Sequence, residues 1–161
     1  MRAVDVTEML YRNRYLQQAG ESISRWVEGH AATTYAGYYV EHSHGGLIYV
    51  GFTGNQVELV EALKRDSGFV APERIMGFPV PPRYSLNELN AIFNELWEAW
   101  DSIESITSMR IDTAANRIVV GAQDVEGVHN ALVARFGAGA PIVVVYSRGS
   151  VLFPGDAAPN R

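Results

Sequence analysis

The chain has 161 residues, 47% of them hydrophobic and 19% charged, a composition typical of a folded globular protein and not of a disordered one. Its formal net charge of −5 argues against a surface that binds nucleic acid or an anionic membrane, although a basic protein partner would be attracted. The absence of cysteine excludes disulfide bonds, cysteine-containing zinc sites and thiol catalysis.

The N-terminal part of the chain predicts a long helix. Residues 7–28 carry apolar side chains at intervals of three and four, and Thr7 is suited to cap the first turn. Charged residues interrupt residues 1–30, so we expect no signal peptide there, and the signal of an exported protein would be missing from this chain. No apolar run reaches the ~20 residues of a membrane-spanning helix.

A β-hairpin is predicted next, formed by residues 35–41 and 47–53, in which aromatic and β-branched residues dominate. His44, Gly45 and Gly46 supply its turn. Residues 56–65 predict a short amphipathic helix with one buried face. Residues 71–75 are predicted to form an edge strand, because the proline at position 72 is tolerated at an edge and not in a central strand.

A rigid linker with three prolines, residues 79–82, separates this part from a strongly amphipathic helix over residues 85–104. Ser85 and Glu88 form a capping box at its start. Its apolar stripe includes Trp97 and Trp100, which we expect in the core; the alternative is that Trp26 joins them in an interaction patch. Acidic residues of this helix lie off the stripe and are predicted to face solvent: Glu95, Glu98, Asp101 and Glu104.

The remaining residues repeat the hairpin, helix and strand pattern. Residues 106–112 and 117–122 alternate as half-buried strands around a turn at 113–116. Residues 125–136 predict a helix that the glycine at position 137 ends. The isoleucine and valine run over 141–146 predicts a well-buried strand, and residues 149–161 are predicted to be a flexible tail.

This repeat limits the fold. We predict an α+β protein with two related hairpin-helix-strand lobes, each a small antiparallel sheet with helices on one face, joined by the long amphipathic helix. The predicted parts are residues 1–80 (first helix and first lobe), 81–105 (linker and connecting helix), 106–148 (second lobe) and 149–161 (tail).

Few residues suggest catalysis or metal binding. His42 and His44 flank Ser43, and two histidines so spaced in a strand can place both rings on one side and bind zinc. The simpler interpretation is a pair of polar turn residues that face water, because no third ligand is near in sequence. No Gly-x-Ser-x-Gly nucleophile motif is present. We therefore expect no enzyme, no catalytic residue, no bound metal and no cofactor; a small metal-dependent enzyme that uses His42 and His44 is a remote alternative.

Four stretches of the second unit carry a family resemblance: residues 106–112, residues 116–120, the helix that ends at 136–137 and the strand from 141. Together they resemble the C-terminal part of a known pro-domain. That pro-domain belongs to secreted bacterial serine proteases of the α-lytic protease and streptogrisin type. The first unit, residues 35–40 and 46–53, looks like the N-terminal half of the same pro-regions. The resemblance extends over about residues 8–148.

The resemblance implies a secreted, non-catalytic module that assists folding of a serine protease and inhibits it. Its partner would be the protease domain, with no nucleic acid and no membrane. The strand at 141–146 would pair with a protease hairpin by strand addition, and the tail from 147 to about 153 would enter the substrate cleft. The implied partner-binding residues are Ile142, Val143, Val144, Val145, Tyr146, Ser147, Arg148, Val151, Leu152 and Phe153.

Residues 155–161 depart from the family pattern, since they look like a linker and not like a cleavage junction. The alternative hypothesis is a free-standing protein-binding or peptidase-inhibitor module that uses the same strand on another chain.

Overall fold

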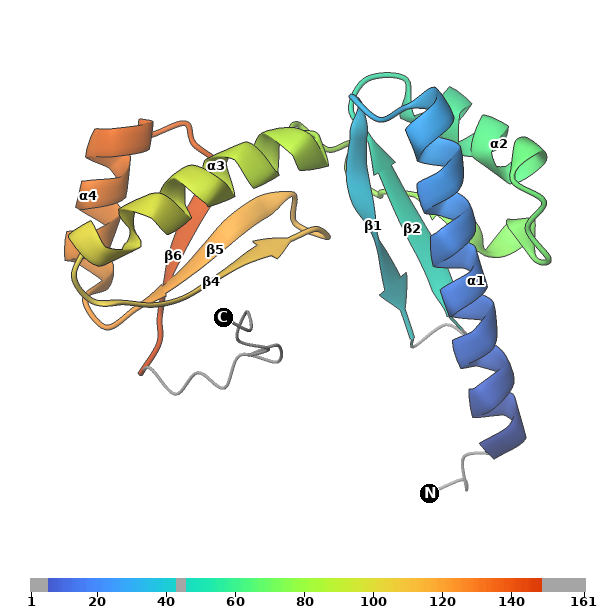
Figure 1. Ribbon diagram of the computed structural model, residues 1–161, viewed down its shortest axis with the longest axis horizontal. Coiled ribbons are helices and arrows are strands. Elements are labelled where there is room, and N and C mark those ends of the chain that lie inside the picture. Colours follow the sequence, from blue (N-terminus) through green and yellow to red (C-terminus); the bar gives the residue numbers. More distant parts are fainter. Residues whose placement is uncertain (1–5, 43–45, 149–161) are drawn as a thin grey trace, which may run out of the picture. The chain divides into compact units, whose positions relative to one another are not determined.

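The computed structural model describes residues 6–42 and 46–148, with side chains from residue 14 onward. The chain divides into two compact units, residues 1–89 with 113–116 and residues 90–112 with 117–161. Each unit has its own three-stranded sheet with helices packed against it (Figure 1). The predicted α+β fold with two related lobes is confirmed.

The first unit consists of a long helix, a hairpin, a short helix and a third strand. Its elements are α1 (Val6–His30), β1 (Tyr35–Glu41), β2 (Leu47–Phe52), α2 (Gln56–Asp66), a 3₁₀ turn (Pro72–Arg74) and β3 (Ile75–Gly77). β2 lies between an antiparallel β1 and a parallel β3. Ile48, Val50 and Phe52 share one face of β2 and are fully buried in a core with residues of α1 and α2. Both helices therefore cover the same face of this sheet.

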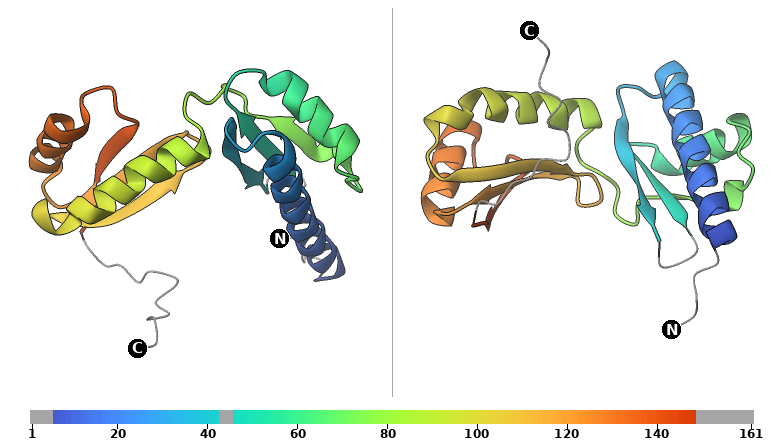
Figure 2. Two further views of the ribbon diagram at one scale, coloured as in Figure 1. Left: turned by 45° about the horizontal axis from the view of Figure 1, so that its top comes forward. Right: turned by 60° about the horizontal axis from the view of Figure 1, so that its bottom comes forward.

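The second unit has the same order of α-helices and strands, with its 3₁₀ turn at a different place. Its elements are α3 (Leu86–Ala99), a 3₁₀ turn (Trp100–Ser102), β4 (Ile106–Asp112), β5 (Arg117–Ala122), α4 (Val125–Phe136) and β6 (Ile142–Tyr146). β5 is central, antiparallel to β4 and parallel to β6. Ile118, Val120 and Ala122 lie on one face of β5 and are fully buried. Figure 2 shows α3 as a layer across this sheet.

The two sheets agree in their irregularities as well as in their topology. The register of the first hairpin shifts between Tyr35 and Gly37, and the register of the second shifts between Ile106 and Ser108. Immediately outside each hairpin, the N–H of the residue after the second strand donates to the carbonyl of the residue before the first strand, from Thr53 to Thr34 at 2.8 Å and from Gln123 to Ser105 at 3.0 Å. Both sheets are mixed and not antiparallel throughout, because the chain crosses over through a helix before the third strand.

Local capping interactions fix the start of α3. The Ser85 N–H donates to Glu88 Oε2 at 2.7 Å, and the Glu88 N–H donates to Ser85 Oγ at 3.3 Å, so the predicted capping box is confirmed. The turn between β4 and β5 supports the same region. Asn116, with a left-handed φ of 50°, accepts the N–H groups of Arg83 and Tyr84 and donates to the Tyr84 carbonyl.

Two local predictions are wrong. Residues 72–74 form a 3₁₀ turn, and the third strand begins only at Ile75. Proline at the first position of such a turn loses no internal hydrogen bond, which explains why Pro72 starts the turn and not the strand.

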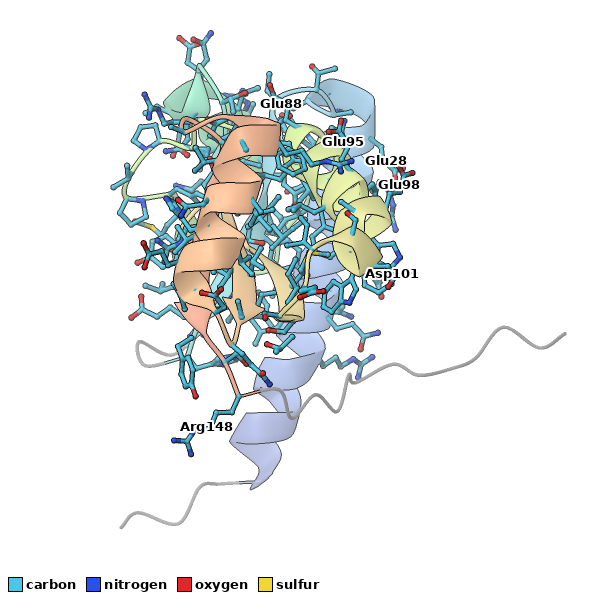
Figure 3. All side chains as sticks on the ribbon, turned by 90° about the vertical axis from the view of Figure 1, so that its left-hand side faces the viewer. Glu28, Glu88, Glu95, Glu98, Asp101 and Arg148 are labelled. Atoms are coloured by element: carbon cyan, nitrogen blue, oxygen red, sulfur yellow. The ribbon has the colours of Figure 1, made fainter. Side chains whose placement is uncertain are left out.

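Trp97 does not lie in the core, because its side chain is 56% exposed. Leu89, Leu96 and Ala99 occupy the buried side of α3, and Trp97 follows Leu96 by one residue, about 100° around the helix. Trp97 instead packs beside the half-buried Trp100, with 5.7 Å between ring centroids. The acidic residues Glu95, Glu98, Asp101 and Glu104 are exposed as predicted. Figure 3 labels Glu95 and Glu98 on α3 and Asp101 in the 3₁₀ turn that follows it.

Candidate partner-binding edge

β6 is an edge strand of the second sheet, with β5 as its one neighbour among the described residues. The prediction of a well-buried strand is wrong. Ile142, Val143 and Val144 are half-buried, Val145 is 42% exposed and Tyr146 is 63% exposed. An edge strand has sheet on one side only, which accounts for this exposure.

The hydrogen bonds at the two ends of β6 show which main-chain groups face outward. The Ile118 N–H donates to the Pro141 carbonyl at 2.7 Å, and the Ser147 N–H donates to the Ala122 carbonyl at 2.9 Å. Only alternate residues of a strand can face one parallel neighbour, so residues 141, 143, 145 and 147 face β5. The N–H and C=O groups of Val144 and Tyr146 therefore point away from the sheet.

At Ile142 the outward position is only partly open. Its N–H donates to the Ala140 carbonyl at 2.8 Å, which leaves the carbonyl as its outward group. β6 thus presents two donors, at Val144 and Tyr146, and three acceptors to a strand that would lie beside it. Unpaired edge groups of this kind are a template for pairing with another chain.

The other three edge strands carry features that discourage such pairing. β3 has only three residues, and Pro79 follows it closely. β1 has a register shift near its start and ends in Glu41. β4 has a similar shift and carries Arg110 and Asp112, whose charged groups lie 3.9 Å apart. Short strands, prolines, charges and bulges all blunt an edge, and β6 itself contains no proline, charge or register shift.

The two faces of β6 have different surroundings. Ile142, Val144 and Tyr146 pair in register with the buried residues Ile118, Val120 and Ala122, so they lie on the helix-covered face. Val143 and Val145 lie on the opposite face. Just beyond the strand, the Arg148 guanidinium donates to the Tyr146 hydroxyl at 3.4 Å, and the Gln123 amide donates to the Arg148 carbonyl at 3.5 Å. The structure therefore brings together the predicted residues 142–148.

The remaining candidate residues are those of the tail and of the histidine pair. Val151, Leu152 and Phe153 lie outside the described residues, and so does His44. His42 is exposed in the turn that follows β1. Within residues 14–42 and 46–148, no three histidine, aspartate or glutamate side chains gather in a group that could hold a metal ion.

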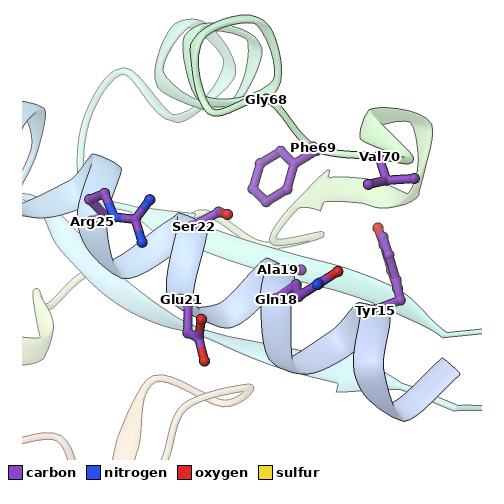
Figure 4. Close-up of a pocket in the computed structure, with 9 residues that line it drawn as sticks. All are labelled: Tyr15, Gln18, Ala19, Glu21, Ser22, Arg25, Gly68, Phe69 and Val70. Carbon is purple, nitrogen blue, oxygen red and sulfur yellow. The ribbon is translucent and has the colours of Figure 1, made fainter. Parts of the chain in front are cut away.

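A separate hollow lies in the first unit, between α1 and residues 68–70 (Figure 4). Its volume is about 260 Å³, slightly below the usual range for ligand pockets. Gln18, Ser22 and Arg25 line it from α1, and Phe69 and Val70 face them from the loop. The Tyr15 hydroxyl at one end donates to the Ala71 carbonyl at 3.1 Å.

Two tyrosines of the first sheet have altered acidity. Burial raises the pKa of Tyr35, with a smaller contribution from Tyr38. Burial also raises the pKa of Tyr39, and the neighbouring Tyr49 and Glu41 act in the same direction. Both shifts favour the neutral hydroxyl, so neither side chain is activated as a nucleophile or a general base.

Comparisons with known proteins add no assignment, because the chain matches no protein-family model and no curated protein. None of the helices in the described part of the chain is long and apolar enough to cross a membrane.

Proposed function

We propose that this chain is a non-catalytic, pro-domain-like module that binds a serine protease domain of the α-lytic protease or streptogrisin type. It would assist folding of that domain and inhibit it afterwards. Its location would be secreted or extracellular. The resemblance of both repeats to such pro-regions names the partner. The observation that carries the mode of binding is the open edge of β6, with its outward donors at Val144 and Tyr146.

Strand addition suits this edge for a physical reason. A partner strand beside β6 would bond to main-chain groups that are already fixed in an extended geometry, so little conformational entropy is lost on this side. The aliphatic side chains of β6 would at the same time lose exposed apolar area to the partner. β6 would pair with a hairpin of the protease only after that hairpin has formed. Binding would therefore favour a partly folded protease over the unfolded chain.

The test is refolding and inhibition of a streptogrisin-type protease domain with this chain added in trans. The wild-type chain should raise the yield of refolded protease and inhibit the native enzyme. Val144→Pro removes an outward donor and should weaken inhibition at least about tenfold, since one hydrogen bond is lost and the ring obstructs pairing. Val144→Ala keeps the donor and loses side-chain volume, so it is the matched control and should stay within about threefold of wild type.

The outcomes separate the candidate functions. Inhibition that Val144→Pro abolishes, without any gain in refolding yield, would favour the free-standing inhibitor over the folding assistant. Neither refolding nor inhibition by the wild-type chain would refute the proposed protease partner.

A further inference from the structure

A small cavity lies between α4 and the first residues of β6. His129, Leu132 and Val133 of α4 line it together with Ile142 and Val144 of β6. Ala140, just before the strand, also lines it. Its volume is about 30 Å³. A single water needs roughly 10–15 Å³ of such space, so this cavity has room for two or three groups the size of water.

The alternation of β6 determines what would enter this cavity. Val144 lies on the face that α4 covers, and its N–H and C=O both point away from β5. In an added strand, the residue directly opposite Val144 would form main-chain hydrogen bonds with it and would point to the same face. The side chain of that one residue would therefore lie over the cavity.

We infer that the strand added to β6 carries a small aliphatic residue, best a valine, opposite Val144. This inference rests on the proposed strand addition and adds a specificity rule to it. Two methyl groups fit the cavity and bury apolar area against Leu132 and Val133, whereas an aromatic ring is too large. A charged side chain would lose hydration there, because the lining is mainly apolar and His129 is its one ionisable side chain.

The net charge favours a strand from a different polypeptide over one from a second copy of this chain. The chain has a net charge of −5, which opposes association with a second copy and attracts a basic partner. The occupant is thus an extended segment of a basic protein with a valine or another small aliphatic residue at this position.

The experiment measures binding of labelled peptides to the full chain by fluorescence anisotropy. The probe is a nine-residue peptide with lysine at both ends, threonine elsewhere, and valine, alanine, phenylalanine or aspartate at the centre. The valine peptide should bind about tenfold more tightly than the alanine peptide, because two buried methyl groups contribute about 0.8 kcal/mol each. Phenylalanine and aspartate should bind more weakly than alanine.

Variants of the chain locate the effect. Ala140→Leu fills the cavity and should remove the preference for valine while the alanine peptide still binds. Ala134→Leu makes the same change at an exposed position of α4 and should leave the preference intact.

Each alternative outcome has its own meaning. Peptides that bind equally well whatever the central residue, and lose binding with Val144→Pro, would overturn the inference and leave strand addition standing. Failure of every peptide to bind the wild-type chain would overturn both. A dimer of the chain alone that Val144→Pro dissociates would assign the edge to a second copy and refute the heterologous partner.

Discussion

Proline substitution at neighbouring positions of β6 should lower stability by different amounts. The Val143 N–H faces β5, where the register places the Ile118 carbonyl as its acceptor, and Ile118 is fully buried. Val143→Pro would leave that carbonyl without a donor, at a cost of about 1–3 kcal/mol in the free energy of unfolding. The Val144 N–H faces away from the sheet, so Val144→Pro loses no ladder bond and should cost less than about 1 kcal/mol.

Urea denaturation followed by far-UV circular dichroism measures both effects, with one transition fitted for each unit. Val143→Ala and Val144→Ala are the controls, because they remove side-chain volume and keep both N–H groups. After subtraction of the alanine values, the remaining cost should be concentrated at Val143. Equal costs at the two positions, or a larger cost at Val144, would refute the alternation derived for β6.

Four further substitutions test other parts of the structure. Trp97→Ala should cost less than about 1 kcal/mol because the side chain is 56% exposed, whereas Trp26→Ala, at 6% exposed, should cost about 3–5 kcal/mol; equal losses in urea denaturation would contradict this placement. Asn116→Gly keeps the left-handed backbone but loses the side-chain bonds to the segment before α3, so the midpoint of thermal unfolding should fall by an amount equivalent to about 1–3 kcal/mol. Hydrogen bonds from the main chain and then the side chain of Ser85 lower the pKa of Glu88 in the folded state, so Glu88 stabilises the fold above the unfolded pKa and loses this effect as the pH falls through the folded value. The stability difference between wild type and Glu88→Gln should therefore disappear in acid, and a constant difference down to pH 2 would contradict the capping role.

The fold could be predicted from local patterns because strong signals coincide in this sequence. The bounds of β1, β4, β5 and α4 follow from alternation and from the glycines or polar turns beside them. The repeat then indicates two sheets of the same topology. The predictions failed where burial depends on partners that are distant in sequence, as for Trp97, whose place on α3 depends on which side of the helix meets the sheet.

The candidate site could be predicted only in part. The aliphatic run over Ile142–Tyr146 indicated a strand, and β-branched residues suit a buried strand and an edge strand equally well. Its place beside β5 alone, and the direction of each N–H group, follow from the parallel crossover through α4, which no local pattern contains. The cavity under Val144 likewise needs the packing of α4 on β6 before it can be recognised.

Residue-by-residue amide hydrogen exchange of β6, measured by NMR, tests the open edge most directly. In the chain alone, the Val144 and Tyr146 amides should exchange rapidly, while those of Val143 and Val145 are protected by β5. Addition of a streptogrisin-type protease domain should slow exchange at Val144 and Tyr146. Amides of Val144 and Tyr146 that are already protected in the chain alone, or that stay unprotected in a complex that forms, would contradict strand addition at β6.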